Sequence, residues 1–446
     1  MKLTHTEYLK IAIPFVASTV TLPLLGAVDT AIIGRLCVTE LLGGIAIGTL
    51  VMNTLYWLFG FFHVSTTGQS AMALGSNNPA DRINSLLRPA ALAAFVGLVF
   101  IFLQEGIWHV VEWGVAPDPA VGQHAKAYFD IMIFGAPFVL VNYTLIGWLM
   151  GQEKARETLV IQVMGNVLNM ALDILLVLYL DMGIIGVAAA TLIAQVTTFG
   201  VGVALVLKTG QFSLRTHLKS LSLSRRDFRV ILSSNVDLLL RMVCLLVFFN
   251  IVVRIGCELG TDVLATNAIF LQVVYVMSYL FDGVANASSV FAGKAVGQKN
   301  PKLLDRVICI TAQYTMVLIV VMTLVTFIFE RHIVSVFTSI PELVELSLSL
   351  STWLLIFPLF AGFGLTFYGI FTGTGTTKPV RNASFMTLVV FLFVQLVSVP
   401  NFGNHGFWLS FILFYVGRFA FMYPHIGYVR QKCLCPPNES FSRVGS

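Results

Sequence analysis

The sequence predicts an all-α polytopic membrane protein with twelve transmembrane helices in two parallel six-helix lobes, related by a pseudo-two-fold axis along the membrane normal. Two observations predict this fold class. First, 57% of the 446 residues are hydrophobic and only 11% are charged, whereas charged residues make up about 25% of an ordinary soluble domain. Second, one half of the sequence repeats the other at a fixed offset, which predicts two similar lobes.

Apolar stretches long enough to cross a bilayer as a helix recur along the whole chain. They cover roughly residues 9–35, 43–69, 84–108, 124–150, 158–180, 184–207, 229–256, 263–293, 303–329, 343–373, 381–401 and 406–428. The first stretch is too long for a signal peptide and is flanked by Lys10 rather than by a small-residue cleavage site. We therefore expect it to be the first of twelve spans.

The distribution of Lys and Arg predicts the orientation of these spans. If the N-terminus is cytoplasmic, 21 of the 27 Lys and Arg residues fall on the cytoplasmic side, four fall outside and two lie within spans. Cytoplasmic loops carry such an excess of basic residues. We expect a multi-pass protein of the bacterial inner (plasma) membrane with both termini in the cytoplasm. The net charge of +5 thus reports topology and indicates no nucleic-acid partner.

The internal repeat places position 75 onto position 297. Gly-Ser-Asn-Asn-Pro at 75–79 corresponds to Gly-Gln-Lys-Asn-Pro at 297–301, and Gly147-xxx-Gly151 corresponds to Gly369-xxx-Gly373. The GxxxG patterns are typical of close helix packing. Six spans per repeat keep the same membrane orientation, so the halves are expected to be parallel. The expected domains are an N-terminal lobe (1–207), a cytoplasmic linker (208–228) and a C-terminal lobe with a cytoplasmic tail (229–446).

The most unusual residue is Asp29, a carboxylate in the middle of the first apolar stretch. A carboxylate in the membrane interior is costly and indicates a proton or cation site. A candidate partner lies on the fifth stretch, where polar residues recur at spacings of 4, 3 and 4 and so share one helix face: Gln162, Asn166, Asn169 and Asp173. At the repeat offset, Asp29 falls on Ile251 and Asp173 falls on Gln395. The ion chemistry is therefore predicted in the N-terminal lobe.

The first span also contains residues that weaken a helix. Pro14 and Pro23 each remove a backbone hydrogen bond, and Gly26 adds a flexible position shortly before Asp29. This pattern is compatible with a helix that bends during transport. It is equally compatible with a static kink that neighbouring helices satisfy.

Several further polar residues lie within spans. Asp237 precedes Arg241 by four residues, which predicts a structural ion pair along one helix. Asp282 and Asn286 belong to a polar stripe of the eighth span that either lines a substrate cavity or is packed and hydrogen-bonded. Further candidates for the lining of a substrate cavity are Asn142 in the fourth span, Gln162 and Asn166.

Together these features resemble the MATE (multidrug and toxic compound extrusion) transporters over essentially the whole chain. The resemblance rests on the two parallel halves, on the spacing from Pro14 to Asp29, and on Asn169-xxx-Asp173 followed by Thr191 in the sixth span. It implies that Asp29, Asn169, Asp173 and Thr191 form the proton or cation site. It also implies that the first helix bends at Pro14.

The branch of the family is indicated by two segments. Residues 281–288, Phe-Asp-Gly-Val-Ala-Asn-Ala-Ser, are similar to the DinF branch. The NorM branch has an acid in the tenth span, which serves a sodium site, whereas residues 351–373 contain no Asp or Glu. The resemblance to DinF and this difference from NorM favour proton coupling.

The expected function is a proton-coupled antiporter for multidrug efflux by alternating access, in which protonation of the N-lobe carboxylates bends the first helix and releases the substrate. Its expected partners are small amphipathic or cationic organic compounds, protons and the lipid bilayer. We expect a monomer without a cofactor, a resident metal or a nucleic-acid partner. Sodium coupling stays open because all four site residues are oxygen donors, as does a lipid flippase of related architecture. No enzymatic activity is expected, because HExxH, His-box and GxSxG motifs are absent from the sequence.

Overall fold

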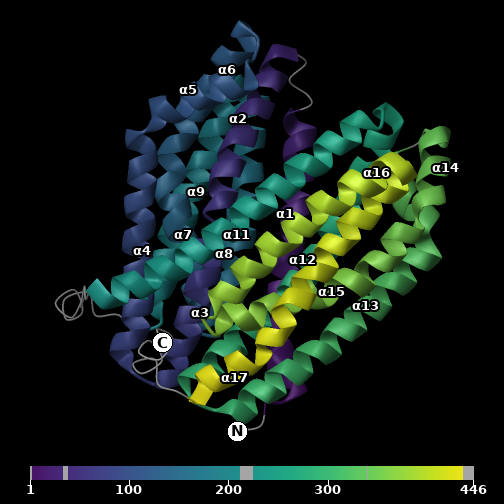
Figure 1. The fold of residues 1–446 in the computed structure, drawn as a ribbon. Coiled ribbons are helices and arrows are strands. Elements are labelled where there is room, and N and C mark those ends of the chain that lie inside the picture. The colour runs from purple at the N-terminus through teal and green to yellow at the C-terminus, as the bar shows by residue number, and fades with distance from the viewer. Residues whose placement is uncertain (1–2, 34–38, 211–224, 339, 435–446) are drawn as a thin grey trace. The chain divides into compact units, whose positions relative to one another are not determined.

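The computed structural model describes residues 3–33, 39–210, 225–338 and 340–434, with side chains for 3–19, 41–210, 232–338 and 340–434. The described residues are mostly helical and contain no β-strand, which confirms the all-α class. They form two compact units (Figure 1): the N-terminal unit, Val20–Leu232, and the C-terminal unit, which combines Met1–Thr19 with Ser233–Ser446. The domain limits taken from the sequence repeat stay a prediction.

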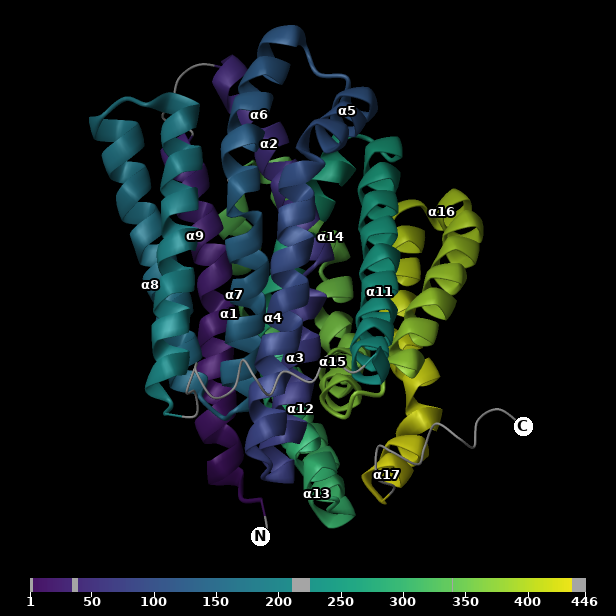
Figure 2. The same cartoon turned by 90° about the vertical axis from the view of Figure 1, so that its left-hand side faces the viewer.

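The N-terminal unit contains eight α-helices, a short 3₁₀ turn, and a π-helical segment, η2, among its described residues. The helices are α2 (Thr39–Leu58), α3 (Phe61–Ser76), α4 (Pro79–Phe102), α5 (Gln104–Val115), α6 (Pro119–Met132), α7 (Ala136–Gly151), α8 (Ala155–Asp173) and α9 (Gly183–Lys208), with η1 at Ile133–Gly135 and η2 at Ile174–Tyr179. Helix α7 packs against α3, α4 and α9, and α8 lies beside α9 (Figure 2).

The C-terminal unit contains the longest helices of the chain. Its elements are α11 (Arg225–Glu258) from Ser233 onward, α12 (Thr261–Gly297), α13 (Pro301–Phe337), α14 (Pro341–Leu350), α15 (Thr352–Gly373), α16 (Thr377–Met422) and α17 (Ile426–Leu434), with a 3₁₀ turn, η4, at Tyr423–His425. Helix α15 packs against α12, α13 and α16. Helix α1 (His5–Ile33) contributes its first residues, up to Thr19, to this unit.

The sequence repeat is present in the structure as a repeated helix junction. Asn77 and Lys299, which are equivalent in the repeat, both have a left-handed backbone, with φ of 56° and 50°. The following residues, Asn78 and Asn300, cap α4 and α13: each side-chain oxygen accepts a hydrogen bond of 3.1 Å from a backbone N–H of the next helix. A proline then occupies the first turn of both helices. The repeated motif therefore encodes a turn that ends one helix and starts the next.

Two further turns repeat at the same offset. Glu153 and Gly375 have φ of 60° and 64°, and Asp181 and Gly403 have φ of 50° and 55°. Asp181 lies in the connection between η2 and α9, whereas Gly403 lies inside α16. Helix α16 is therefore two arms that meet at Gly403 and lie side by side, with the rings of Phe391 and Phe414 6.2 Å apart (Figure 1).

The GxxxG patterns pack helices closely in both units, as predicted. A side chain at Gly147 or Gly151 would collide with α3, at the backbone of His63 and Thr67. A side chain at Gly369 or Gly373 would collide with α12, at Ala285 and Ser289, the residues equivalent to His63 and Thr67 in the repeat. The same pair of glycines thus makes the same helix contact twice.

Ten segments of the described residues are long and apolar enough to cross a membrane. Three of the ten combine consecutive helical elements (α2 with α3, α6 with η1 and α7, and α8 with η2), and a fourth runs from α16 to α17 and contains both arms of α16. If the two arms of α16 are counted as two spans, and α1, which is not among the ten segments, is added, the total is the twelve expected spans. The chain is a multi-pass membrane protein.

The first part of α1 is anchored to α12 within the C-terminal unit. The hydroxyl of Tyr8 lies 2.7 Å from that of Ser288, and the hydroxyl of Thr19 donates a 2.9 Å hydrogen bond to the carbonyl of Tyr279. Between these contacts Val16 packs on Gly283, where a larger residue would not fit. The described backbone stays helical through Pro14 and Pro23.

Candidate functional site

The N-terminal unit brings together two of the four predicted ion-site residues. The amide nitrogen of Asn169 on α8 lies 3.3 Å from the hydroxyl of Thr191 on α9. The Thr191 hydroxyl in turn donates a 3.0 Å hydrogen bond to the carbonyl of Val187, one turn earlier on α9. Asn169 is buried, with 6% of its surface exposed. At Asn169 the polar stripe of α8 therefore faces α9.

Asp173 lies one turn beyond Asn169 on α8 and is also buried, at 3% exposure. It is the last residue of α8, and the helix continues from Ile174 in π-helical form. A π-helical segment widens the backbone ladder and is frequent at functional sites. It follows that the buried carboxylate lies where the hydrogen-bonding pattern of the helix changes.

Asp29, Pro23 and Gly26 lie in the part of α1 whose side chains are outside the described residues. The described backbone is helical at all three positions. The approach of the Asp29 carboxylate to Asp173 therefore stays a prediction.

Three further amide side chains lie inside the N-terminal unit with a buried oxygen atom. Asn142 on α7 and Gln162 on α8 were expected to line a cavity, and the side-chain oxygen of each is buried without a hydrogen-bond partner among the described residues. Gln195 on α9 has the same property. It was missed in the sequence, although it follows Thr191 by four residues and therefore shares its helix face. Asn166 is partly buried on α8.

In the C-terminal unit the predicted ion pair between Asp237 and Arg241 is wrong. The carboxylate of Asp237 on α11 instead accepts hydrogen bonds from Arg381, at 2.7 Å, and from Thr377, at 2.8 Å. Both partners lie in the first two turns of α16. Helix α11 turns Asp237 toward α16, so an interhelical partner replaces the residue one turn further along the same helix.

Arg241 lies over the ring of Tyr368 on α15, with 4.1 Å from its guanidinium carbon to the ring centre. Asp282 on α12 is partly buried and interacts electrostatically with both Arg241 and Arg418. Asn286, one turn further along α12, is also partly buried. Arg418 is one of the two basic residues that the sequence places within spans. The signal that it belongs with Asp282 is tertiary, because the two residues lie on helices far apart in the sequence.

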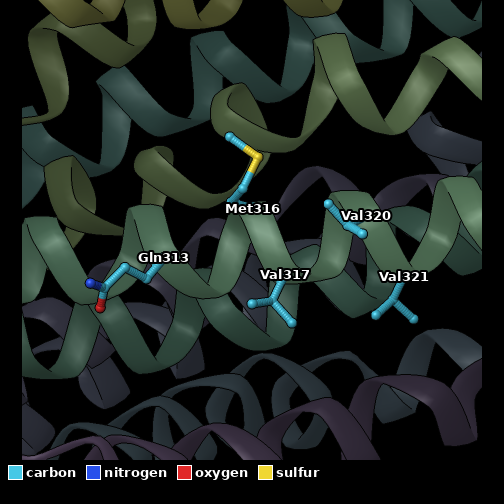
Figure 3. Close-up of a pocket in the computed structure, with 5 residues that line it drawn as sticks. All are labelled: Gln313, Met316, Val317, Val320 and Val321. Atoms are coloured by element: carbon cyan, nitrogen blue, oxygen red, sulfur yellow. The ribbon is translucent and has the colours of Figure 1, made fainter.

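A hollow on the surface of the C-terminal unit is apolar and contains none of these residues. It has a volume of about 440 Å³ and follows one side of α13, along Gln313, Met316, Val317, Val320 and Val321 (Figure 3). The Met and the three Val side chains are about half exposed. An exposed apolar helix face of this kind is typical of lipid contact, so we place the candidate sites among the buried polar residues instead.

A helical bundle with buried polar and charged side chains inside apolar spans is the arrangement of a membrane transporter. The MatE family model matches residues 14–175 and again residues 238–397. The second match covers the positions that the internal repeat makes equivalent to the first, to within a few residues, so the family unit itself occurs twice. The chain belongs to the MatE family, whose members are transporters.

Relatives confirm this assignment over nearly the whole chain. DNA damage-inducible protein F of Escherichia coli (strain K12) is 31% identical over 404 residues, which cover 91% of this chain and 88% of the relative. This match confirms the resemblance to the DinF branch. The probable multidrug resistance protein NorM of Thermotoga maritima is 23% identical, and the match covers 91% of this chain and 88% of that relative.

Solved structures share the fold. The crystal structure of a MATE protein in its bent conformation has a TM-score of 0.85 and 18% identity, and the match covers 96% of this chain and 95% of that protein. The crystal structure in the straight conformation gives the same values. The fold similarity therefore extends to both conformations.

Proposed function

We propose that this protein is a proton-coupled antiporter that exports amphipathic, often cationic organic compounds from the cytoplasm across the bacterial inner membrane. The observation that carries the proposal is the buried polar set Asn169, Asp173 and Thr191 on α8 and α9, in a chain of the MatE family. The names of relatives support the substrate class, because one of them is a probable multidrug resistance protein. We propose that the protein acts as a monomer with both termini in the cytoplasm.

The coupling follows from the chemistry of two carboxyl groups in an apolar lobe. If the carboxyl groups of Asp29 and Asp173 lie close together, ionising both of them at once is costly. The pair therefore holds one shared proton or takes up a second one. A proton from the outer face would neutralise the site and weaken its attraction for a cationic substrate. Loss of the proton toward the cytoplasm would restore the negative charge and accept the next substrate. Asn169 and Thr191 supply neutral hydrogen-bonding groups beside Asp173.

Bending of α1 would connect protonation to substrate release. The contacts of Tyr8 and Thr19 with α12 hold the helix on both sides of Pro14. A bend at Pro23 or Gly26 would preserve both contacts, whereas a bend at Pro14 would break one of them. Pro14→Ala and Pro23→Ala variants separate these two hinge positions, because only the variant at the true hinge would slow release.

The test is efflux of a fluorescent cationic dye from proteoliposomes under an imposed pH gradient and, separately, under an imposed sodium gradient. We expect efflux with the pH gradient, and a loss of at least about 10-fold in Asp29→Asn and in Asp173→Asn, because a group that takes up and releases the proton is removed. The matched control is Asp118→Asn, a carboxylate in the loop before α6, which should keep the wild-type rate. Wild-type efflux in Asp29→Asn would refute the N-lobe proton site.

The same proteoliposome assay distinguishes two alternatives, sodium coupling and lipid flipping. The oxygen donors of the N-lobe site also suit sodium, and sodium coupling would appear as efflux under the sodium gradient alone. A lipid flippase would move fluorescent lipid between leaflets and leave the dye inside. Either result would refute the proposal of a proton-coupled drug exporter.

A further inference from the structure

The C-terminal unit holds two buried guanidinium groups that form no salt bridge within the described residues. Arg241 on α11 is 7% exposed and Arg418 on the second arm of α16 is 5% exposed. The described ion pairs all involve other basic residues. The Nε of Arg241 is buried without a described hydrogen-bond partner, and its Nη1 lies 3.6 Å from the sulfur of Met242.

Aromatic rings and closely packed helices surround these two groups. Arg241 lies over Tyr368, and the guanidinium carbon of Arg418 lies 5.7 Å from the ring centre of Tyr415. Both rings are buried. Helices α15 and α16 approach each other closely at Gly364, where an added Cβ would lie 3.0 Å from the carbonyl of Tyr415 and 3.5 Å from the Cβ of Arg418. Each guanidinium group thus lies beside a buried tyrosine ring.

One acidic side chain interacts with this pair. Asp282 on α12 interacts electrostatically with both guanidinium groups, and Arg418 also interacts with Arg241. When Asp282 is ionised, two positive charges and one negative charge leave the cluster with one excess positive charge.

A guanidinium group has five N–H donors, and burying it without acceptors is unfavourable. A tyrosine face offsets only part of that loss. An anionic oxygen group between Arg241 and Arg418 would accept hydrogen bonds from both and would neutralise the excess charge. Arginine binds planar carboxylate and phosphate groups in this way, often with two parallel hydrogen bonds.

We propose that Arg241 and Arg418 form a binding site for the anionic group of an apolar organic molecule, such as a carboxylate, whose body packs on the tyrosines of α15 and α16. Asp282 limits the site to a single net negative charge. This site lies in the C-terminal unit and is separate from the N-lobe proton site. The exporter would then accept organic anions or zwitterions in addition to cations.

The test compares two probes with the same fluorophore and opposite charge, dansylglycine and dansylcadaverine, on the purified full-length protein. We expect dansylglycine to bind the wild type and to bind Arg418→Gln and Arg241→Gln about 10- to 100-fold more weakly, since a charge-assisted hydrogen bond is lost. Dansylcadaverine should bind all three proteins equally. The control is Arg331→Gln, an exposed arginine of α13, which should change neither affinity.

The Asp282→Asn variant keeps both arginines, so it can test the proposal even if an arginine variant fails to fold. Removal of its charge should tighten dansylglycine binding, because the competing carboxylate is gone. Absence of dansylglycine binding to the wild type, or equal binding to wild type and Asp282→Asn, would overturn the proposal. Neither outcome affects the pH-driven efflux of a cationic dye, so the anion site and the proposed exporter can fail independently.

Discussion

At the residue scale, buried charges in the C-terminal unit interact with groups on other helices. Asp237 and Arg241 share one face of α11 in sequence, yet Asp237 pairs with α16 and Arg241 lies over a ring of α15. A spacing of four residues permits an ion pair worth only about 0.2–0.5 kcal/mol on an exposed helix. The buried carboxylate of Asp237 instead accepts one hydrogen bond each from Arg381 and Thr377 of a neighbouring helix, and these contribute more.

The first prediction concerns this pair. Asp237→Asn should lower the free energy of unfolding by about 1–3 kcal/mol, because the charge-assisted hydrogen bond from Arg381 is lost. The loss should stay below that of a fully buried pair, since 34% of the Arg381 side chain is exposed and can be rehydrated. Thermal unfolding in detergent measures it.

The matched control is Glu345→Gln. The side chains of Arg331 and Glu345, which form a salt bridge, are 70% and 69% exposed. Such surface pairs contribute about 0–1 kcal/mol. Equal destabilisation by Asp237→Asn and Glu345→Gln would contradict the difference in burial on which the prediction rests.

At the element scale, glycines decide how closely helices approach. Gly369 and Gly373 place α15 against the carbonyls of α12, and Gly147 and Gly151 place α7 against α3. In a membrane, close van der Waals packing replaces much of the hydrophobic driving force between helices. These contacts are therefore expected to contribute strongly to the stability of each unit.

The second prediction is that Gly369→Ala destabilises the protein by about 1–3 kcal/mol, because the added Cβ would overlap the carbonyl of Ala285 and force the helices apart. The readout is the thermal midpoint and the monodisperse fraction in size-exclusion chromatography.

Gly200→Ala is the matched control within α9, since nothing described lies within 4 Å of the added Cβ. Alanine is a better helix former than glycine by about 1 kcal/mol, so this variant should be as stable as the wild type or more stable. A loss of stability at Gly200 equal to that at Gly369 would show that packing is not the cause.

At the scale of the whole molecule, the basic residues predict the membrane orientation. Single cysteines at Asp118 and Asp181, in a background without the native cysteines, should be labelled by an impermeant reagent added outside whole cells. Cysteines at Arg82 and Lys299 should be labelled only after the cells are opened, because the positive-inside rule places these turns in the cytoplasm. Labelling of Lys299→Cys in intact cells would show that the orientation is the opposite of the predicted one.

The sequence alone determined the fold class, the number of spans and the duplication, because these follow from local composition and from repeated motifs such as Asn78-Pro79 and Asn300-Pro301. The turns at Asp181 and Gly403 follow the same repeat. The turn at Gly403 lies between the two arms of α16. The stripe from Gln162 to Asp173 could also be predicted, since helical periodicity fixes which residues share a face.

Only the tertiary structure decided which residues on different helices meet. It placed Asn169 beside Thr191, gave Asp237 the partner Arg381, and brought the buried Arg241 and Arg418 together with the partly buried Asp282. Periodicity gives the direction of a side chain around its own helix. The partner depends on how neighbouring helices are rotated and how closely they pack, and that is set by distant contacts such as the one at Gly364.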